Sequence, residues 1–299
     1  MNGVPFNKVI EQHADNIWPI VQSMNHKFLW SSIACLSALF GAFAVSARAA
    51  APSHLLVVTV TKGFRHSSIP TAEKILAELA QKSGAFTVDY VRNDQEMAEK
   101  MTPESLQKYD GVVFANTTGD LPLPDKQAFL DWIKSGKAFI GMHSATDTFR
   151  GHKPLDPYVE MIGGEFKHHG EQAEVECLDQ DPKHPACRDL NPTFKLKDEI
   201  YLLNGFERGN VHGLLALDKH PNDRTPGDYP IAWCKMYGKG RVFYTSLGHR
   251  EDVWDPDWRD KDGKRENPRE VSQIYQKHIL GGIKWALGRE KGDASPQTK

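Results

Sequence analysis

Short apolar runs that alternate with amphipathic segments are the feature that most constrains the fold of this chain. The runs are too short for buried helices, so they predict strands that are covered on both faces of a sheet. The intervening segments Ile69–Lys82 and Asp125–Lys134 have apolar residues at helical spacing. This alternation is typical of a doubly wound α/β fold, with a mostly parallel central sheet and helices on both faces. The strands are expected at Leu55–Val60, Phe86–Val91, Gly111–Ala115 and Lys137–Met142.

The second half of the chain predicts further strands and one long helix. No linker divides it from the first half, so residues 50–288 are expected to form a single domain. The polar residues 289–299 are expected to form a disordered tail. The expected elements are strands at Ala173–Leu178, Glu199–Leu203, Ile231–Met236 and Arg241–Ser246, and a helix at Val271–Leu287.

The N-terminal residues are expected to direct export and not to join the fold. Residues 24–49 have the parts of a signal peptide: a basic start, the apolar stretch Phe28–Val45, and small residues at Ala47 and Ala49. An uncleaved membrane anchor is the alternative, but the small residues favour cleavage. Residues 1–23 fit no part of a signal peptide and are interpreted as a mis-annotated leader. The domain is therefore expected to be periplasmic or secreted, with no membrane anchoring after signal cleavage.

Three cysteines follow the expected signal peptide, and export permits a disulfide. Cys177 and Cys187 are close enough in sequence to pair, and the sequence is equally consistent with free thiols at both positions. Cys234 lies in an apolar run and is expected to be a buried small hydrophobic residue.

Histidines follow several of the expected strands at the point where the strand ends. His66 comes shortly after the first strand, His143 directly after the fourth, and His249 shortly after the strand at 241–246. The carboxyl ends of parallel strands meet at one edge of an open α/β sheet, and ligands bind at that edge. The sequence therefore predicts that these imidazoles belong to one reaction site.

The segment before the first helix has the composition of an anion-binding turn. Gly63 permits close approach of a ligand, and Arg65 and His66 would flank an anionic or oxyanionic group at the helix N-terminus. The alternative is a helix cap by Ser67 or Ser68 with solvated neighbours.

The segment Gly141–Ala145 has the outline of a nucleophile elbow, a strained turn at the end of a strand. His143 stands at the position of the nucleophile, so acyl transfer is not expected. A general base or a metal ligand suits an imidazole better. Ser144 can hydrogen-bond a substrate hydroxyl. The alternative is that His143 only caps the following helix.

Further polar side chains come from the second half of the chain. Glu199 and Tyr201 would share one face of a strand, where they can act as acid, as base or as binders of hydroxyl groups. The adjacent His168 and His169 point apart in an extended chain, so at most one of them is expected to face a site.

Six motifs in order give the chain a resemblance to the ThuA-like (trehalose utilisation) family over residues 55–288. The motifs are Gly63–His66, Gly141–Ser144, Gly163–Phe166 with His169, Asp198–Tyr201, Pro230–Trp233 and Leu247–His249. The resemblance implies a flavodoxin-like sandwich of the class I glutamine amidotransferase-like type. It also implies a role in carbohydrate catabolism, notably of disaccharides oxidised to 3-keto forms. His143 stands where these amidotransferases have cysteine, so their glutaminase chemistry is not expected. The resemblance selects His169 from the histidine pair.

The implied chemistry is abstraction of a proton next to a ketone. In a 3-keto glycoside a base would remove the hydrogen on C2, and the enediolate would expel the C1 substituent or be reprotonated to move the carbonyl. His143 or His249 is the expected base, and Glu199 and Tyr201 would position hydroxyl groups or protonate the leaving oxygen. Arg65, with the helix N-terminus or a bound divalent metal, would hold the enediolate. The expected catalytic residues are His143, His249 and Glu199, and the expected substrate-binding residues are Arg65, His66, Ser144, His169 and Tyr201.

Two other functions are open at this stage. One is a non-catalytic sugar-binding or partner module, which would need fewer titratable groups and more aromatic platforms. The other is a metal-dependent glycoside hydrolase, for which Glu165 and Glu199 are the candidate carboxylates. The sequence identifies no cofactor, and a divalent metal such as Zn²⁺ would need three or four ligands. The histidines available to it are His66, His143, His169 and His249. The net charge of −2 argues against a nucleic-acid partner and leaves a small carbohydrate as the expected one.

Overall fold

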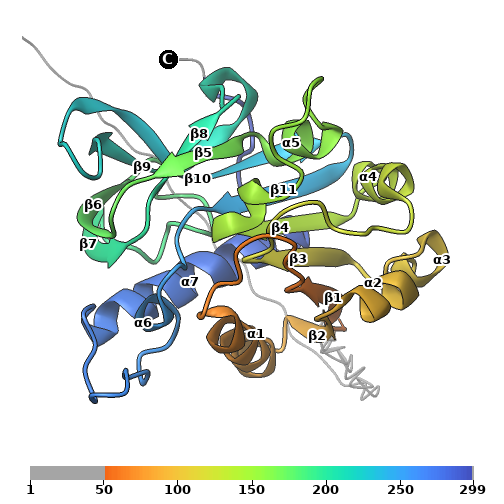
Figure 1. Cartoon of the computed structure of the whole chain (residues 1–299), viewed down its shortest axis with the longest axis horizontal. Coiled ribbons are helices and arrows are strands. Elements are labelled where there is room, and N and C mark those ends of the chain that lie inside the picture. Colours follow the sequence, from red (N-terminus) through yellow and green to blue (C-terminus); the bar gives the residue numbers. More distant parts are fainter. Residues whose placement is uncertain (1–50, 298–299) are drawn as a thin grey trace, which may run out of the picture. The chain divides into compact units, whose positions relative to one another are not determined.

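The computed structural model describes residues 51–297, which are built around one nine-stranded sheet (Figure 1). The strands that the sequence predicted are present with small shifts of their ends. They are β1 (Ser53–Val58), β2 (Phe86–Val91), β3 (Gly111–Ala115), β4 (Ala138–Met142), β6 (Ala173–Asp179), β8 (Tyr201–Asn204), β10 (Pro226–Tyr237) and β11 (Gly240–Thr245). The structure adds β5 (Glu165–His169), β7 (Thr193–Asp198) and β9 (His212–Lys219).

The helices include the three long ones that the periodicity predicted, α1 (Ile69–Ser83), α4 (Lys126–Lys134) and α7 (Arg269–Ala286). Apolar residues recur along one face of each, and those residues are buried. The shorter helices are α2 (Asp94–Lys100), α3 (Pro103–Leu106), α5 (Pro157–Ile162), α6 (Glu251–Trp254), and the 3₁₀ turns η1 (His143–Asp147) and η2 (Arg208–Asn210).

The nine-stranded sheet is mixed, so the prediction of a mostly parallel sheet was wrong for the sheet as a whole. Its order is β2-β1-β3-β4-β11-β10-β9-β6-β7, and only the pairings from β2 to β11 are parallel. The other half is antiparallel. Antiparallel neighbours can be joined by tight turns such as Tyr237–Gly240, without a crossover helix. The flavodoxin-like description remains a prediction.

Helices cover both faces of the sheet, as the sequence predicted. Successive residues of β1 point to opposite faces: Leu55 and Val57 pack in the core beneath α1 and α7, whereas Leu56 and Val58 pack in the core beneath α2 to α5. Figure 1 shows these two groups of helices on either side of the parallel strands. The mixed α/β assignment is therefore correct.

The carboxyl ends of the parallel strands open on one edge, where the chain leaves each strand for a loop. β1 leads to the segment of His66, β4 leads into η1, and β11 leads to the segment of His249. A separate two-stranded sheet of β5 and β8 pairs His169 with Tyr201, and β5 packs against η1. This small sheet therefore reaches the same edge from the antiparallel half.

The C-terminal segment, for which disorder was predicted, contacts the edge of the fold through hydrogen bonds up to residue 297. The backbone N–H of Gln297 donates to the carbonyl oxygen of Val211 at 3.0 Å, and Trp285 Nε1 donates to the carbonyl oxygen of Gly292 at 3.2 Å. The carbonyl oxygen of Ser295 lies 2.9 Å from His212 Nδ1. The tail is polar, but its polar groups find partners at the edge of the fold.

The cysteines after the expected signal are buried free thiols, so the disulfide alternative is not observed. Cys187 Sγ instead contacts the carbonyl oxygen of Leu214 at 3.5 Å. Burial raises the pKa of Cys177, Cys187 and Cys234. Cys234 is buried in the main core, as the sequence predicted.

The expected leader (1–23) and signal peptide (24–49) lie outside the described residues. Within residues 51–297, no helix has both the length and the apolar character needed to cross a bilayer.

Candidate functional site

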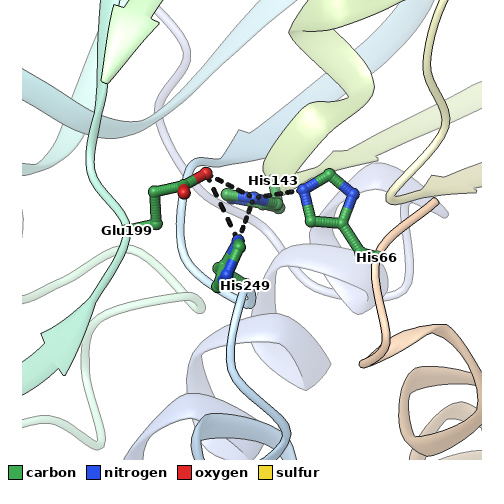
Figure 2. A group of neighbouring side chains, drawn as sticks. All are labelled: His66, His143, Glu199 and His249. Atoms are coloured by element: carbon green, nitrogen blue, oxygen red, sulfur yellow. Dashed lines mark hydrogen bonds and ion pairs between the residues drawn. The ribbon is translucent and has the colours of Figure 1, made fainter. Parts of the chain in front are cut away.

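Three imidazoles and one carboxylate converge at the carboxyl edge of the parallel strands (Figure 2). His143 Nε2 lies 3.2 Å from His66 Nε2, 3.3 Å from His249 Nδ1 and 3.6 Å from Glu199 Oε1. His249 Nδ1 is also 3.3 Å from Glu199 Oε1. In Figure 2 His143 lies at the centre of the other three. The predicted convergence of His66, His143 and His249 is therefore observed, and the sequence candidate Glu199 joins them.

The nucleophile-elbow outline predicted the local backbone of His143. Its φ is +46°, in the left-handed region that non-glycine residues rarely adopt. A Cβ at Gly141 would lie 3.0 Å from Ile162 Cδ1 and 3.1 Å from the Tyr244 ring, so this strand end admits only glycine without rearrangement. His143 Nδ1 donates to the carbonyl oxygen of Ser246 at 2.9 Å. This contact turns Nε2 toward the cluster.

His66 is held by the loop between β1 and α1. Its Nδ1 lies 3.3 Å from Ser144 Oγ, and its ring packs edge-on against those of Phe64 and His143. Burial, followed by the charges of the neighbouring imidazoles, lowers the pKa of His66 to about 3. His66 is therefore neutral at physiological pH. Ser144 is fully buried, so its predicted contact with substrate is replaced by a contact with His66.

Glu199 follows Asp198, and the two carboxylates have separate tasks. Asp198 is buried at the end of β7 and accepts hydrogen bonds from the backbone N–H groups of Gly248 (2.8 Å) and Arg250 (3.2 Å). It therefore fixes the loop that carries His249. Burial opposes ionisation of Glu199, but contacts with His143 and His249 outweigh it and hold the pKa of Glu199 well below its usual range. The same carboxylate raises the pKa of His249 in spite of burial.

A cavity of about 350 Å³ opens onto one side of the cluster. It is lined by Gly63, Phe64, His66, Asp147, Arg150, Phe166, His169, Glu199, Tyr201 and His249. His143 is not in this lining and is fully buried, so it is not placed to contact a substrate directly. A cavity of similar size, about 370 Å³, lies beside the C-terminal segment, but no histidine lines it.

His169 and Tyr201 form one wall of the cavity, as predicted. His169 Nδ1 is 3.2 Å from Glu199 Oε2 and 2.8 Å from the carbonyl oxygen of Gly170. Its ring stacks beside those of Phe166 and Tyr201, and its side chain is 41% exposed. Tyr201 packs against His143 with ring centroids 4.4 Å apart, and burial raises the pKa of its hydroxyl.

The structure does not bring Arg65 to the cavity, where a substrate-binding role was predicted for it. Its guanidinium turns back and donates to the carbonyl oxygen of Thr59 at 2.9 Å, and the residue does not line the cavity. The cation in the lining is Arg150, which pairs with Asp147 and lies over the Phe166 ring. Arg150 and Asp147 were not among the residues predicted from the sequence, although both lie shortly after His143 in the chain.

Two expected roles of neighbouring groups are also corrected. Ser68 stands at the start of α1, but its side chain contacts the carbonyl oxygen of Gly248 at 3.2 Å and does not cap the helix. Glu165 accepts from the backbone N–H of Gly151 at 2.9 Å and lies outside the cavity lining. The carboxylates that do line the cavity are Glu199 and Asp147.

The cluster can do two things chemically. Neutral imidazoles beside a carboxylate can accept and pass protons, and they can ligate a transition metal through their lone pairs. The four residues with ligand atoms within 4.8 Å of one another are His66, His143, Glu199 and His249.

Comparison with known proteins gives a family match and similar folds. A family model described as ThuA, trehalose utilisation, matches residues 54–261. A solved ThuA-like protein from Parabacteroides merdae is 19% identical, with a TM-score of 0.60 over 80% of this chain and 91% of that one. One from Bacteroides uniformis is 20% identical, with a TM-score of 0.56 over 82% and 95%. A cytoplasmic protein from Salmonella typhimurium LT2 is 15% identical, with a TM-score of 0.52 over 78% and 99%. No curated protein matches.

Proposed function

Because the chain belongs to the ThuA (trehalose utilisation) family, we propose that it is an enzyme of carbohydrate catabolism whose reaction site is the cavity beside the histidine cluster. The observation that carries this proposal is the convergence of three imidazoles and Glu199 on a cavity of small-molecule size. A module that only binds sugar would not need such a group of titratable side chains. We also propose, from the family, that the fold is related to class I glutamine amidotransferases.

The lining of the cavity suits a carbohydrate. Phe64 and Phe166 offer aromatic faces for the C–H surface of a sugar ring, and Phe64 is 67% exposed. Asp147 and Arg150 provide an acceptor and several donors for hydroxyl groups. This combination of apolar walls with a few polar groups is typical of small-molecule sites.

The proposed substrate is a 3-keto glycoside, and the proposed step is removal of its C2 proton. The base takes the proton, the electron pair of the C2–H bond forms the enediolate with the C3 carbonyl, and the enediolate expels the C1 substituent. The leaving oxygen takes up a proton, so the products are an alcohol and an unsaturated keto sugar. Reprotonation would instead move the carbonyl, and attack of water on C1 would give hydrolysis.

His169 is the imidazole best placed to be the base. Its Nδ1 is engaged by Glu199 and by the carbonyl of Gly170, while its Nε2 has no hydrogen-bond partner among the described residues. This replaces the expected bases: His143 is buried, and His249 turns Nδ1 toward Glu199 and His143. A carboxylate that orients the imidazole is the usual support for a general base. Arg150, the cation in the cavity lining, can then stabilise the developing oxyanion.

An NMR time course with trehalose and 3-ketotrehalose, supplied separately, tests this proposal. Selective loss of the keto sugar, with glucose release or a shifted carbonyl, is expected. His169→Ala should lower kcat by at least roughly 100-fold, the usual contribution of a general base. His168→Ala is the matched control because His168 is exposed on the same strand and outside the cavity lining. Broadened resonances without turnover would instead indicate a binding module and reject the enzyme proposal.

We further propose that the reaction takes place outside the cytoplasm. The proposal rests on the signal-like sequence of residues 24–49. N-terminal sequencing of the protein recovered from the periplasm or medium should give a start near residue 50. Recovery of the intact chain from the cytoplasm would contradict it.

A further inference from the structure

We propose that His66, His143, His249 and Glu199 bind one divalent transition-metal ion of the Zn²⁺ class, through His66 Nε2, His143 Nε2, His249 Nδ1 and Glu199 Oε1. The four side chains come from four different segments of the chain, and His66, His249 and Glu199 all face His143 in Figure 2. This site does not depend on the identity of the substrate.

The separations between the four atoms are those of a metal coordination shell. Ligands held about 2.0–2.1 Å from zinc at tetrahedral angles lie roughly 3.3–3.4 Å from one another. From His143 Nε2 the distances to the other three atoms are 3.2, 3.3 and 3.6 Å, and His249 Nδ1 lies 3.3 Å from Glu199 Oε1. All the remaining separations are within 4.8 Å. Small movements of the side chains would therefore complete the shell.

Hydrogen bonding alone leaves part of this arrangement unexplained. A carbonyl oxygen can only accept, so His143 donates its Nδ1–H to Ser246 at 2.9 Å. His143 Nε2 faces two ring nitrogens and a carboxylate oxygen at 3.2, 3.3 and 3.6 Å. One ring nitrogen has a single proton or a single lone pair, so a hydrogen bond accounts for only one of these three contacts. A metal ion between the four atoms would contact all of them.

The surrounding contacts resemble the supports of known metal ligands. Ligating histidines usually donate their second ring N–H to a carbonyl or another acceptor, as His143 does to Ser246 and His66 can do to Ser144. Glu199 contacts His169 through its second oxygen, which leaves Oε1 for the ion. The left-handed backbone of His143 is the kind of strain that persists at functional sites.

The donor set selects the class of ion. Three imidazole nitrogens and one carboxylate oxygen suit Zn²⁺ and its transition-metal neighbours, whereas Mg²⁺ and Ca²⁺ prefer oxygen ligands. His66, His249 and Glu199 also line the cavity, so the ion would be open to a substrate oxygen on that side. A bound ion would supply Lewis-acid polarisation of a carbonyl oxygen there. Glu199 thus replaces His169 in the ligand set that the sequence suggested.

Metal content and metal affinity, measured without any sugar, test the inference. The purified protein, freed of any affinity tag and treated with chelator, is given Zn²⁺, desalted and analysed by elemental mass spectrometry. About one equivalent per chain is expected. Titration calorimetry should show at least roughly 100-fold weaker zinc binding for His249→Ala and Glu199→Gln. Loss of a residue that only hydrogen-bonds a metal ligand already lowers metal affinity by about 10–100-fold, and loss of a ligand should cost at least as much. Ser144→Ala should weaken binding roughly tenfold by the same reasoning.

His168→Ala and His152→Ala are the controls, because both histidines are exposed and lie outside the cluster. Circular dichroism must show that each variant is folded. If His249→Ala does not fold, the affinity of Glu199→Gln alone tests the inference. A Co²⁺-loaded protein should show a visible absorption band that is altered in both ligand variants and unchanged in the controls. Zinc retention below about one tenth of an equivalent in the wild type, or equal affinity in wild type and folded ligand variants, would overturn the inference. Zinc binding without sugar turnover would refute the proposed reaction alone.

Discussion

Asp252 is a buried carboxylate whose replacement by asparagine should destabilise the segment around His249. It accepts hydrogen bonds from the backbone N–H groups of Glu266 (2.8 Å) and Asn267 (2.9 Å), from the Asn267 amide (2.9 Å) and from Arg250 Nε (3.0 Å). These bonds join the start of α6 to residues 266–267 and to the residue that follows His249. The amide of an asparagine at this position would keep one acceptor oxygen and turn an N–H₂ group toward donors.

The structure gives the size of this effect. Burial alone would raise the pKa of Asp252, but the hydrogen bonds from Arg250 and Asn267 outweigh it and lower the pKa to about 2, from an ordinary value of 3.8. This difference corresponds to ~2 kcal/mol of stability. An acid whose folded pKa is lowered stabilises the protein above its unfolded pKa. The contribution from Asp252 is therefore present above pH 3.8 and is lost as the pH falls toward 2.

Urea unfolding followed by circular dichroism measures the prediction. Asp252→Asn should lower the free energy of unfolding by ~2 kcal/mol at pH 7. The part of this loss that comes from ionisation of Asp252 should be about half as large at pH 3. Asp262→Asn is the matched control, because Asp262 is an exposed carboxylate nearby, and its change should stay within about 0.5 kcal/mol. An equal loss for Asp252→Asn at both pH values would refute the reasoning.

Three further results are expected. Gly141→Ala should lower the free energy of unfolding by about 1–3 kcal/mol through overpacking, since its Cβ would lie 3.0 Å from Ile162 Cδ1; an unchanged Tm would contradict this. Burial lowers the pKa of His184 from 6.5 to about 4, so stability should fall as the pH drops through that interval, and His184→Gln should flatten this part of the stability curve. Arg150→Ala should raise KM for the sugar by roughly tenfold or more, whereas Arg65→Ala should leave KM unchanged; the reverse order in steady-state kinetics would show that Arg65 reaches the substrate.

Most of the parallel half of the fold could be predicted because β1, β3 and β4 are largely buried and have continuous apolar sequences. β9 was missed because its apolar sequence, rich in leucine and alanine, does not distinguish a strand from a buried helix. β5 was missed because Glu165–His169 is polar and mostly exposed, and it becomes a strand only by pairing with β8. Strand direction in the antiparallel half depends on turns, which a hydrophobic pattern does not encode.

The site was predictable to the same extent as the strands that carry it. His66, His143 and His249 follow parallel strands, and their common edge is a consequence of topology. Arg65 lies away from the cavity for a local reason: the direction of a long side chain depends on the backbone of its loop, and here the guanidinium donates to the carbonyl oxygen of Thr59. Sequence position alone could not reveal that Arg150 provides the cation.

The antiparallel half contributes the negative charge of the site. The parallel strands alone would bring three imidazoles together without any negatively charged group. Glu199 arrives from the junction of β7 and β8, and Asp198 beside it binds the loop of His249. The same residue pair therefore supplies an ionised oxygen to the cluster and fixes the position of one imidazole. Asp198→Asn should thus weaken zinc binding although Asp198 does not belong to the cluster, and unchanged affinity in a folded variant would show that the loop is held by other contacts.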